Sequence, residues 1–273
     1  MIRSEPPPSE SSGFDLPPSP PSRSGPSRAS APPRREYFLS DCHLGLDGRP
    51  EDRAREARLL RFLDQLIPAE DGLTIDGDLF DFWFTYRRAI PRGGFRVVAR
   101  LESLRRAGLP ITFVGGNHDF WAVPFFRDEV GLEVVDGILT RVIQGRRFWI
   151  AHGDGLGSGD HGYKLLKRVL RNRVATALYG LVHPDLGIRL ATLTSHASRT
   201  YQHPPVGLVE RIRREVADPA FAAGHDVVVL GHLHVPTLWE ENGKALVILG
   251  DWVENCTYLR VEDGRLYLER FTG

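Results

Sequence analysis

Cysteine is scarce in this chain of 273 residues, which has two. Cys42 and Cys256 match no zinc-binding spacing. Their usage suits a reducing compartment, where a buried thiol serves as a small apolar side chain. The sequence therefore argues against a structural zinc site, and we expect Cys42 to pack in the core.

An excess of charge and a long hydrophobic run are also missing. The 35 Lys and Arg residues balance the 35 Asp and Glu residues, so no global field recruits nucleic acid or an anionic membrane, and any polyanion site must be local. No apolar run approaches the roughly 18 residues that span a bilayer. The N-terminus lacks the apolar segment of a secretory signal. These absences leave a globular protein whose chemistry is local.

The N-terminal stretch differs in composition from the rest of the chain. The first 35 residues hold ten of the 20 prolines, interleaved with nine serines. Such a stretch cannot bury enough apolar surface to offset its chain entropy. We predict a disordered tail over residues 1–34 and a single domain over residues 35–273.

Short apolar runs that end in polar clusters recur along this domain and indicate strands. They cover residues 36–45, 72–81, 111–119, 147–154, 226–234 and 245–252. Leucines at helical spacing over residues 50–67 predict a helix between two of them. Alternating strands and helices predict an α/β fold whose sites gather beyond the carboxyl ends of the strands. The C-terminal stretch alternates around Asp263 and Gly264 and predicts a hairpin.

A helical insert over about residues 155–214 breaks this rhythm. Residues 163–182 place an apolar face opposite a row of Lys and Arg. The stretch is either a helix packed on the domain with a solvated basic face, or a lid whose apolar side holds a lipid. An interfacial helix on a membrane is a third, related interpretation.

Metal-ligating side chains stand at the ends of five of the predicted strands. They are Asp41, His43, Asp78, Asn117, His152, His232 and His234. Carboxylate, carboxamide and imidazole groups bind divalent ions such as Mn²⁺, Fe²⁺ or Zn²⁺. On an extended strand Asp41 and His43 would share one face. If one carboxylate bridges, seven groups give each of two ions four protein ligands.

A two-metal site of this kind is suited to hydrolysis. Two ions about 3.5 to 4 Å apart lower the pKa of a shared water and absorb charge on a phosphoryl oxygen. The natural substrate is a phosphate ester or anhydride. Glycines beside the ligands fit tight turns.

The motifs DCHLG, GDLFD, GNHD, HGD and GHLH together resemble the signature of the calcineurin-like metallophosphoesterases, over essentially all of residues 35–273. The resemblance implies two packed mixed sheets flanked by helices, with two metals at one sheet edge. One metal would bind Asp41, His43, Asp78 and His234. The other would bind Asp78, Asn117, His152 and His232, with Asp78 as the bridge. His118 would contact the phosphate and protonate the leaving group, and Asp119 would orient His118.

The match is closer to one branch of this family. The runs GDLFDFW, GNHDFW and HGDGLGSGDHGYK, followed by a basic helical insert, are similar to the UDP-2,3-diacylglucosamine hydrolases of lipid A synthesis. These enzymes cleave the pyrophosphate to UMP and 2,3-diacylglucosamine 1-phosphate, usually with Mn²⁺, and their lid helices clamp two acyl chains. The implied substrate contacts are Asn117, His118, Asp160, Tyr163, Ser195 and Arg199.

Two positions depart from the family pattern. The best-known hydrolases carry arginine where this chain has His118. Asp76 occupies a strand position that is normally aliphatic, and it is either an acceptor behind the metal ligands or a turn residue. Substrate identity is therefore less constrained by the sequence than metal chemistry is.

The resemblance implies a cytoplasmic enzyme that associates peripherally with the inner membrane, takes a lipid-linked UDP-sugar and needs no obligate protein partner. One alternative is a phosphoesterase acting on soluble nucleotides or another phosphodiester. Neutral overall charge argues against a nuclease, because long phosphate tracks call for an extended basic surface. A catalytically inactive binding scaffold is disfavoured because all seven ligands are present.

Overall fold

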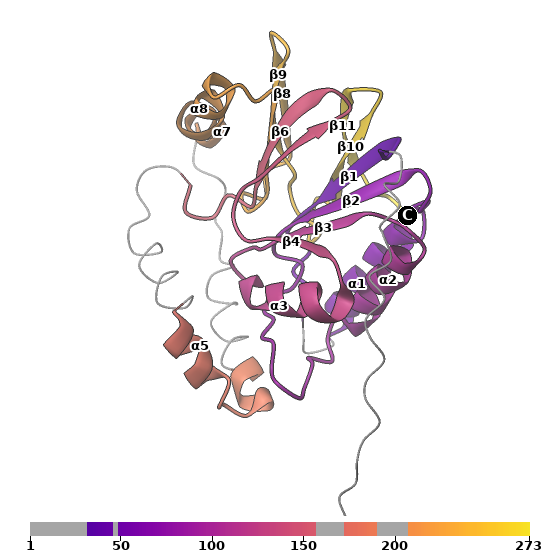
Figure 1. Ribbon diagram of the computed structural model, residues 1–273, viewed down its shortest axis with the longest axis vertical. Coiled ribbons are helices and arrows are strands. Elements are labelled where there is room, and N and C mark those ends of the chain that lie inside the picture. Colours follow the sequence, from indigo (N-terminus) through magenta and orange to yellow (C-terminus); the bar gives the residue numbers. More distant parts are fainter. Residues whose placement is uncertain (1–31, 46–48, 157–171, 190–206) are drawn as a thin grey trace, which may run out of the picture. The chain divides into compact units, whose positions relative to one another are not determined.

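Two mixed β-sheets form the centre of the computed structural model, which describes residues 32–45, 49–156, 172–189 and 207–273 (Figure 1). The first sheet contains β1 (Arg35–Leu39), β2 (Asp71–Asp76), β3 (Ile111–Val114), β4 (Glu133–Val135), β10 (Thr257–Glu262) and β11 (Arg265–Arg270). The second contains β5 (Leu139–Ile143), β6 (Arg146–Ala151), β7 (Val227–Leu230), β8 (Thr237–Glu241) and β9 (Lys244–Ile248). The strand orders are β11-β10-β1-β2-β3-β4 and β5-β6-β7-β9-β8. The predicted fold class is confirmed.

Parallel pairing places the carboxyl ends of the central strands together. Strands β1, β2, β3 and β4 are parallel neighbours, and so are β6, β7 and β9. The polar residues that follow these strands therefore meet at one edge of each sheet. The predicted C-terminal hairpin is present, since β10 and β11 pair antiparallel across the turn at Asp263 and Gly264.

The hydrophobic core lies in layers that follow from period-two alternation along the strands. In β7, Val227 and Val229 face the first sheet, where they join Phe38 of β1 in one cluster. Val228 and Leu230 point to the other side, against the helices over the second sheet. Both faces of β7 are thus buried, which is why its sequence is continuously apolar.

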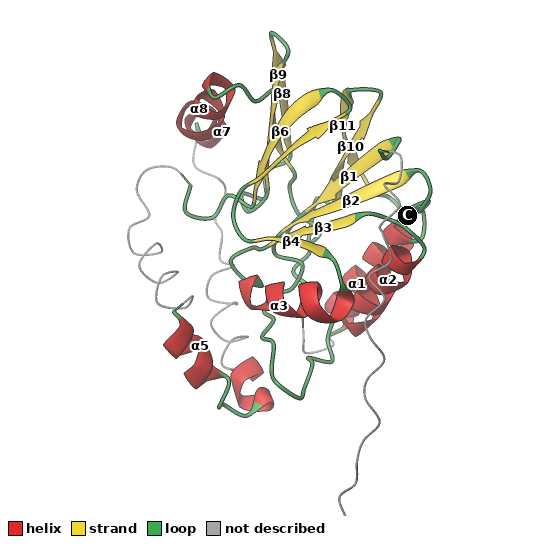
Figure 2. Ribbon diagram, in the orientation of Figure 1, coloured by secondary structure: helices red, strands yellow, loops and turns green. Residues whose placement is uncertain are grey.

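Helices cover the outer face of each sheet (Figure 2). The first sheet is covered by α1 (Pro50–Leu63), α2 (Phe95–Arg106), α3 (Val123–Phe125) and the short 3₁₀ and π-helical turns Phe120–Ala122 and Phe126–Val130. The second is covered by α7 (Leu208–Ile212), a π-helical turn (Arg213–Ala217) and α8 (Asp218–Ala222). Cys42 is fully buried in the cluster beneath α1 and α2, as expected for a packing residue.

The helix predicted over residues 50–67 is observed as α1 and is shorter than expected. It begins with Pro50 in its first turn, where a missing N–H costs nothing, and acidic residues follow at once. It ends at Leu63. Leu66 is still buried, whereas Ile67 is 44% exposed, so the end of the apolar pattern belongs to the following turn.

The predicted insert is described only in part. The structure shows α5 (Arg173–Tyr179) and a helical stretch over residues 184–189, while the predicted tail of residues 1–34 falls almost wholly outside the described ranges. Near the predicted C-terminal end of the insert, Leu208 and Ile212 of α7 pack on the second sheet. Among the described residues, no helix is long and apolar enough to cross a bilayer.

The apolar side predicted for the insert is not packed on the domain in α5. Val174 and Leu178 are 67% and 61% exposed, and Leu181 just beyond the helix is 83% exposed. Tyr179, on another side of the helix, makes the contacts with the rest of the domain. The interpretation of a helix packed by its apolar face therefore does not hold for α5.

A buried carboxyl group lies on β1, away from the sheet edge that carries the polar clusters. Glu36 is 5% exposed, and its Oε1 accepts a hydrogen bond of 3.1 Å from the hydroxyl of Thr74. Burial raises the pKa of Glu36 from 4.5 to about 7, and the hydrogen bond from Thr74 opposes the rise only in part. The unfolded chain therefore releases this proton at lower pH than the folded chain does, so folding stability falls as the pH rises from about 4.5 to about 7.

Glu36→Gln should remove this loss because glutamine is neutral and keeps the oxygen that Thr74 contacts. We expect the melting temperature of the variant to exceed that of the parent by several degrees at pH 8, at about 2–4 °C per kcal/mol, and to equal it near pH 4. Calorimetry across this range measures the difference. Exposed Glu240→Gln is the control, and equal curves for parent and Glu36→Gln would contradict the assignment.

Candidate metal centre

The predicted ligands follow the carboxyl ends of their strands in tight turns. The backbone is left-handed at five of them, with φ values of 53° at Asp41, 46° at His43, 51° at Asp78, 63° at His232 and 53° at His234. The expectation that Asp41 and His43 share a face on an extended strand was wrong, since β1 already ends at Leu39. The turns bring the two side chains together because left-handed residues redirect the chain within a few positions.

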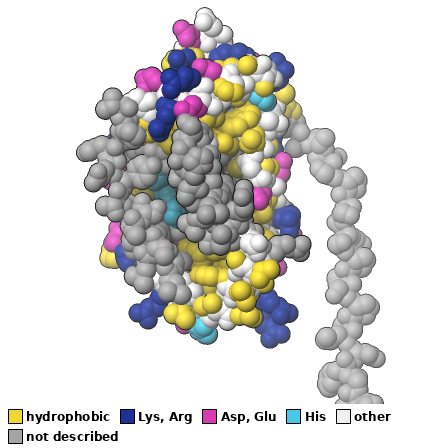
Figure 3. Space-filling model, turned by 90° about the vertical axis from the view of Figure 1, so that its left-hand side faces the viewer, with side chains coloured by type: hydrophobic (Ala, Val, Ile, Leu, Met, Phe, Trp, Pro, Cys, Tyr) yellow, Lys and Arg dark blue, Asp and Glu magenta, His cyan; other side chains and the backbone are white. Residues whose placement is uncertain are grey.

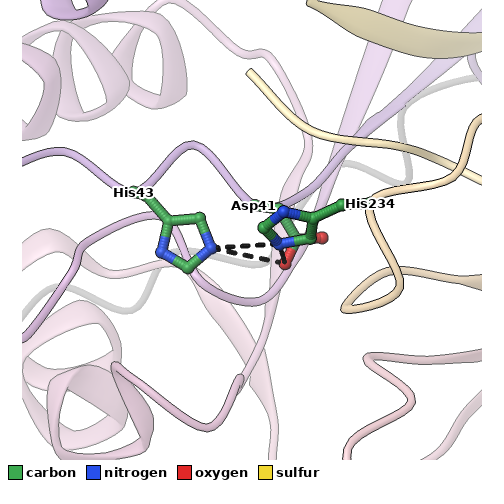
Figure 4. A group of neighbouring side chains, drawn as sticks. All are labelled: Asp41, His43 and His234. Atoms are coloured by element: carbon green, nitrogen blue, oxygen red, sulfur yellow. Dashed lines mark hydrogen bonds and ion pairs between the residues drawn. The ribbon is translucent and has the colours of Figure 1, made fainter. Parts of the chain in front are cut away.

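The first cluster joins Asp41, His43 and His234 (Figure 4). The Nε2 atom of His234 lies 3.1 Å from Oδ1 of Asp41 and 3.3 Å from Nε2 of His43. Asp41 is fully buried, whereas the side chain of His234 is 40% exposed. The three ligand atoms therefore converge at the solvent side of the strand ends.

The second cluster joins Asp78, His152 and His232, with Asn117 beside them. The Nε2 atom of His152 lies 3.1 Å from Oδ2 of Asp78 and 3.0 Å from Oδ1 of Asn117. The His232 ring lies 5.3 Å from the His152 ring. Four of the predicted ligands thus meet here, from four different loops.

Asp78 is the carboxylate placed between the two clusters. Its ligand atoms lie within 4.8 Å of those of His152 and His232 on one side, and of His43 and His118 on the other. All seven predicted ligands are therefore brought into two adjoining groups, with Asp78 in the position expected of a bridging ligand.

The predicted ligand atoms suit a cation, because the atoms that point into the clusters are mostly oxygens and nitrogens that carry lone pairs. The Nδ1 atom of His43 lies 3.2 Å from a carboxylate oxygen of Asp81, and Nδ1 of His152 lies 2.8 Å from the carbonyl of Asp76. When each Nδ1–H donates to its outer partner, Nε2 of a neutral imidazole carries a lone pair that points into the cluster. For His152 this lone pair faces the oxygens of Asp78 and Asn117, so a positive charge is needed between them.

The pKa values of these side chains are shifted because the carboxylates and imidazoles lie close together in a buried place. Burial lowers the pKa of His43, but its hydrogen bonds with Asp41 and Asp81 outweigh this and raise the pKa to about 10. The pKa of Asp78 falls well below its usual range, because the nearby imidazole of His152 outweighs the desolvation. Burial, followed by the charge of His152, lowers the pKa of His232 to about 4. A bound metal ion would replace the protons that the carboxylates attract to His43 and His152.

Two glycines permit the close approach of the loops. A Cβ atom at Gly116 would lie 2.1 Å from Oδ1 of Asp78, and one at Gly77 would lie 2.5 Å from Nδ1 of His152. Gly77 also has a φ of 77°. Any side chain at either position would displace a ligand, which explains the glycines that precede Asp78 and Asn117.

His118 lies beside the two clusters. The group that orients its imidazole is the carbonyl of Asp81, not the side chain of Asp119. Its Nδ1 lies 3.0 Å from the carbonyl of Asp81, and its Nε2 faces the site, 4.0 Å from Oδ2 of Asp78. The expectation that Asp119 orients His118 was wrong. The Asp119 carboxylate instead accepts hydrogen bonds from four backbone amides, those of Asp78, Leu79, Phe80 and Gly116.

Asp119 therefore fixes the two ligand loops to each other, because its four bonds join the loop after β2 to the loop after β3. Sequence reasoning missed Asp81, which contacts His43 through its side chain and His118 through its carbonyl. The signal was present in the motif GDLFD, where Asp81 follows Asp78 by three residues.

Asp76 acts on the site through its backbone. Its carbonyl accepts from Nδ1 of His152, while its fully buried carboxyl oxygens have no hydrogen-bond partner within the part of the chain that the structure describes. Burial raises the pKa of Asp76 to about 8, against the charge of His152. The acceptor function suggested for Asp76 is thus supplied by the main chain.

An aromatic cluster attaches α5 to the loops of the centre. The Tyr179 ring stacks 5.2 Å from that of Trp121 and lies 4.9 Å from Phe84. The indole N–H of Trp121 donates to Thr176 of α5 at 3.3 Å. Trp121 follows His118 by three residues and Phe84 follows Asp81 by three, so both loops reach from the ligands to the insert. The four predicted contacts Asp160, Tyr163, Ser195 and Arg199 lie outside the described residues.

Comparison with known proteins places this centre in a family. The model of the calcineurin-like phosphoesterases matches residues 35–236, and the chain belongs to this family. It is a hydrolase of phosphoric ester or anhydride bonds, of a family that uses a dimetal centre. Among solved structures, Yfce, a phosphoesterase from E. coli, aligns with a TM-score of 0.43 and 17% identity, over 87% of this chain and 93% of that one.

Curated relatives refine the comparison. The UDP-2,3-diacylglucosamine hydrolase of Porphyromonas gingivalis is 30% identical over 251 residues, covering 85% of this chain and 96% of its own. The protein of that name from Neisseria meningitidis serogroup B is 28% identical over 236 residues, with the same coverage. The family resemblance inferred from the motifs is confirmed.

Asp78→Ala should prevent the binding of both ions, because this carboxylate adjoins both clusters. His234→Ala should cost only the ion of the first cluster. After dialysis against Mn²⁺ we expect two ions per chain in the parent, about one in His234→Ala and almost none in Asp78→Ala, measured by elemental analysis of the purified protein. Asp128→Ala, at an exposed pair with Arg127, is the control. Two ions per chain in Asp78→Ala would refute the arrangement.

Proposed function

We propose that this protein hydrolyses the pyrophosphate of UDP-2,3-diacylglucosamine to UMP and 2,3-diacylglucosamine 1-phosphate, with two Mn²⁺ ions. The names of the relatives support this substrate, and the two adjoining clusters support the chemistry. When bound, the two ions would polarise a phosphoryl oxygen and lower the pKa of the attacking water.

His118 is the residue that we assign to the leaving group. The oxygen of water bonds to the phosphorus of the UMP moiety, the bond to the bridging oxygen breaks, and that oxygen leaves on the lipid phosphate. The carbonyl of Asp81 holds the imidazole through Nδ1, so Nε2 is the nitrogen directed into the site and can deliver a proton. Asn117, whose carboxamide oxygen lies against His152, completes the phosphate side of the site.

The observation that carries the lipid substrate is the attachment of α5. The aromatic cluster holds this helix to the loops that bear Asp81 and His118, while its apolar residues Val174 and Leu178 remain exposed. A soluble nucleotide needs no apolar surface beside the catalytic loops, whereas an acylated sugar does. We assign the remaining sugar and acyl contacts to Asp160, Tyr163, Ser195 and Arg199.

This assignment places the protein in the cytoplasm, at the surface of the inner membrane, without nucleic acid or an obligate protein partner. The alternative is a metallophosphoesterase acting on another phosphodiester or nucleotide. Both functions would use the same metal centre. Only the lipid substrate would need the apolar side chains of the insert.

His118→Ala should lower the rate by about 10² to 10⁴ if the imidazole protonates the leaving oxygen. Metal content should not change, because His118 lies beside the proposed ligand set. Steady-state kinetics and elemental analysis on the same preparation test both statements. His225→Ala serves as the histidine control outside the clusters. A fall in metal content that accounts for the lost rate would remove the assigned role.

The substrate is tested by UMP release from UDP-2,3-diacylglucosamine, in parallel with hydrolysis of bis(p-nitrophenyl) phosphate. We expect strong preference for the lipid nucleotide. Tyr179→Ala should raise KM for that substrate about tenfold, since aromatic contacts contribute roughly 0.5–1.5 kcal/mol each, and should leave the small ester unaffected.

The control is Tyr267→Ala, a tyrosine that packs under Arg260 far from the insert in sequence. Equal effects of Tyr179→Ala on both substrates would show that α5 has a general structural role. Absence of UMP formation by the metal-loaded parent would favour the alternative function.

A further inference from the structure

A turn that follows β9, over residues 251–255, lies against the first cluster although it belongs to none of the five sequence motifs. The backbone N–H of Trp252 donates to the carbonyl of Asp41 at 3.0 Å. The carboxamide of Asn255 donates to the carbonyl of His234 at 3.2 Å. This 251–255 turn therefore contacts the main chain of two of the three ligands of the first cluster.

The third ligand is contacted in the same manner from α1. The guanidinium group of Arg55 donates through Nη1 to the carbonyl of His43. Arg55 is only 8% exposed, and its charge is paired with the carboxylate of Asp52 at 3.6 Å. A buried charge is tolerated when it is paired and hydrogen-bonded. All three ligands of the first cluster thus have their main-chain carbonyls bonded to residues that are not ligands.

Asp251 gives the 251–255 turn its shape. Its carboxylate is buried, and Oδ1 accepts hydrogen bonds from the backbone amides of Val253, Glu254 and Asn255 at 2.7, 2.6 and 3.3 Å. Its Oδ2 accepts from the Asn255 carboxamide, the same group that donates to His234. A carboxamide nitrogen carries two protons, so Asn255 can donate one to each partner. Asp251 therefore fixes the direction in which Asn255 donates.

His234 is the ligand of the first cluster that has the least packing around its side chain. Its imidazole is 40% exposed, whereas the side chains of Asp41 and His43 are 0% and 5% exposed. Histidine side chains reach the molecular surface near the centre of the face shown in Figure 3. The φ of 53° at His234 is also unfavourable for a residue with a side chain. Its position therefore depends on hydrogen bonds to its main chain.

We propose that Asn255 and Arg55 are positioning residues that set the affinity of the first cluster for its divalent ion, by holding the main-chain carbonyls of His234 and His43. The inference rests on the metal centre of the proposed function and is independent of the substrate.

The link between carbonyl and imidazole is the backbone of the ligand itself. The carbonyl and the side chain of His234 belong to one residue, and rotation of its φ and ψ angles moves both. Without the Asn255 donor, we expect the carbonyl to turn toward water, because a backbone acceptor needs a partner. The same rotation carries the imidazole away from Asp41.

The second cluster has supports of its own. The Nδ1 atom of His152 is held by the carbonyl of Asp76, and the backbone N–H of His232 donates to Oδ2 of Asp41 at 2.8 Å. Loss of Asn255 or Arg55 should therefore affect the two ions unequally.

Titration of the metal-free full chain with Mn²⁺ tests the proposal, with free Mn²⁺ measured by electron paramagnetic resonance. His234→Ala identifies the first ion by its loss. Asn255→Ala should weaken binding of that ion about 10- to 100-fold, as is typical when a group that orients a metal ligand is removed. Binding of the second ion should be unchanged. Hydrolysis of bis(p-nitrophenyl) phosphate by Asn255→Ala should recover when the Mn²⁺ concentration is raised.

The contact from α1 is tested in the same titration. Arg55→Met should weaken the same ion, and Arg55→Lys, which keeps the charge and an N–H donor, should restore much of the affinity. Melting temperatures check that each variant folds. Asn255 is only partly buried, so its variant tests the proposal even where Arg55→Met does not fold.

Asn242→Ala is the matched asparagine control. Asn242 is exposed in the turn between β8 and β9 and has a φ of 49°. Alanine is disfavoured in this conformation, so the variant should lose stability while it binds both ions as the parent does. The control separates a loss of stability from a loss of ligand position.

A double variant shows whether Asn255 acts through His234. When Asn255→Ala is added to His234→Ala, the ion that remains should bind as it does in His234→Ala alone. Further weakening of that ion would overturn the proposal. So would unchanged binding of both ions in Asn255→Ala, or equal weakening of the two.

The titration contains no substrate, so the outcomes for this inference and for the proposed function are distinguishable. Two ions in the parent without UMP formation would count against the proposed substrate alone. Fewer than two ions in the parent would remove the metal centre and this inference with it.

Discussion

The convergence of electron-pair donors at one edge of the sheets is the constraint on which the functional part of this structure depends. Asp41 directs an oxygen toward His234, and Asp78 and Asn117 direct oxygens toward Nε2 of His152, whose Nδ1 already has the carbonyl of Asp76 as its acceptor. Such a group is unstable in a protein interior without positive charge between its members. Divalent cations would supply that charge, because carboxylate, carboxamide and imidazole groups are their usual ligands.

The ligands are held in place mainly by bonds to the backbone of the loops that carry them. Asp119 binds four amides of two loops, and Asp81 contacts both His43 and His118. Glycines at 77 and 116 let those loops touch. Because the loops start from adjacent parallel strands, the apolar layer between the sheets sets their spacing, and small shifts in that layer would be transmitted to the ligands.

The insert extends the same loops outward. Phe84 and Trp121 follow Asp81 and His118 closely in sequence and meet Tyr179 of α5. The aromatic contacts of Phe84 and Trp121 with Tyr179 therefore connect the polar loops of the metal centre to the exposed apolar side chains of α5. This neighbourhood suits the proposed substrate, which joins a charged pyrophosphate to hydrocarbon chains.

The sequence by itself determined the strands that precede the ligands, the C-terminal hairpin, the α/β class, the seven candidate ligands and the family, because buried strands read as apolar runs and metal ligands must be particular residue types at their ends. It missed β4, β5 and β8. It did not determine why the ligands meet. The left-handed turns at Asp41 and His43, the amide bonds of Asp119, the double contact of Asp81 and the exposure of Leu178 depend on backbone paths and neighbours distant in the chain. Only the tertiary structure decides these, since a pattern along one segment carries no information about the groups that another segment brings against it.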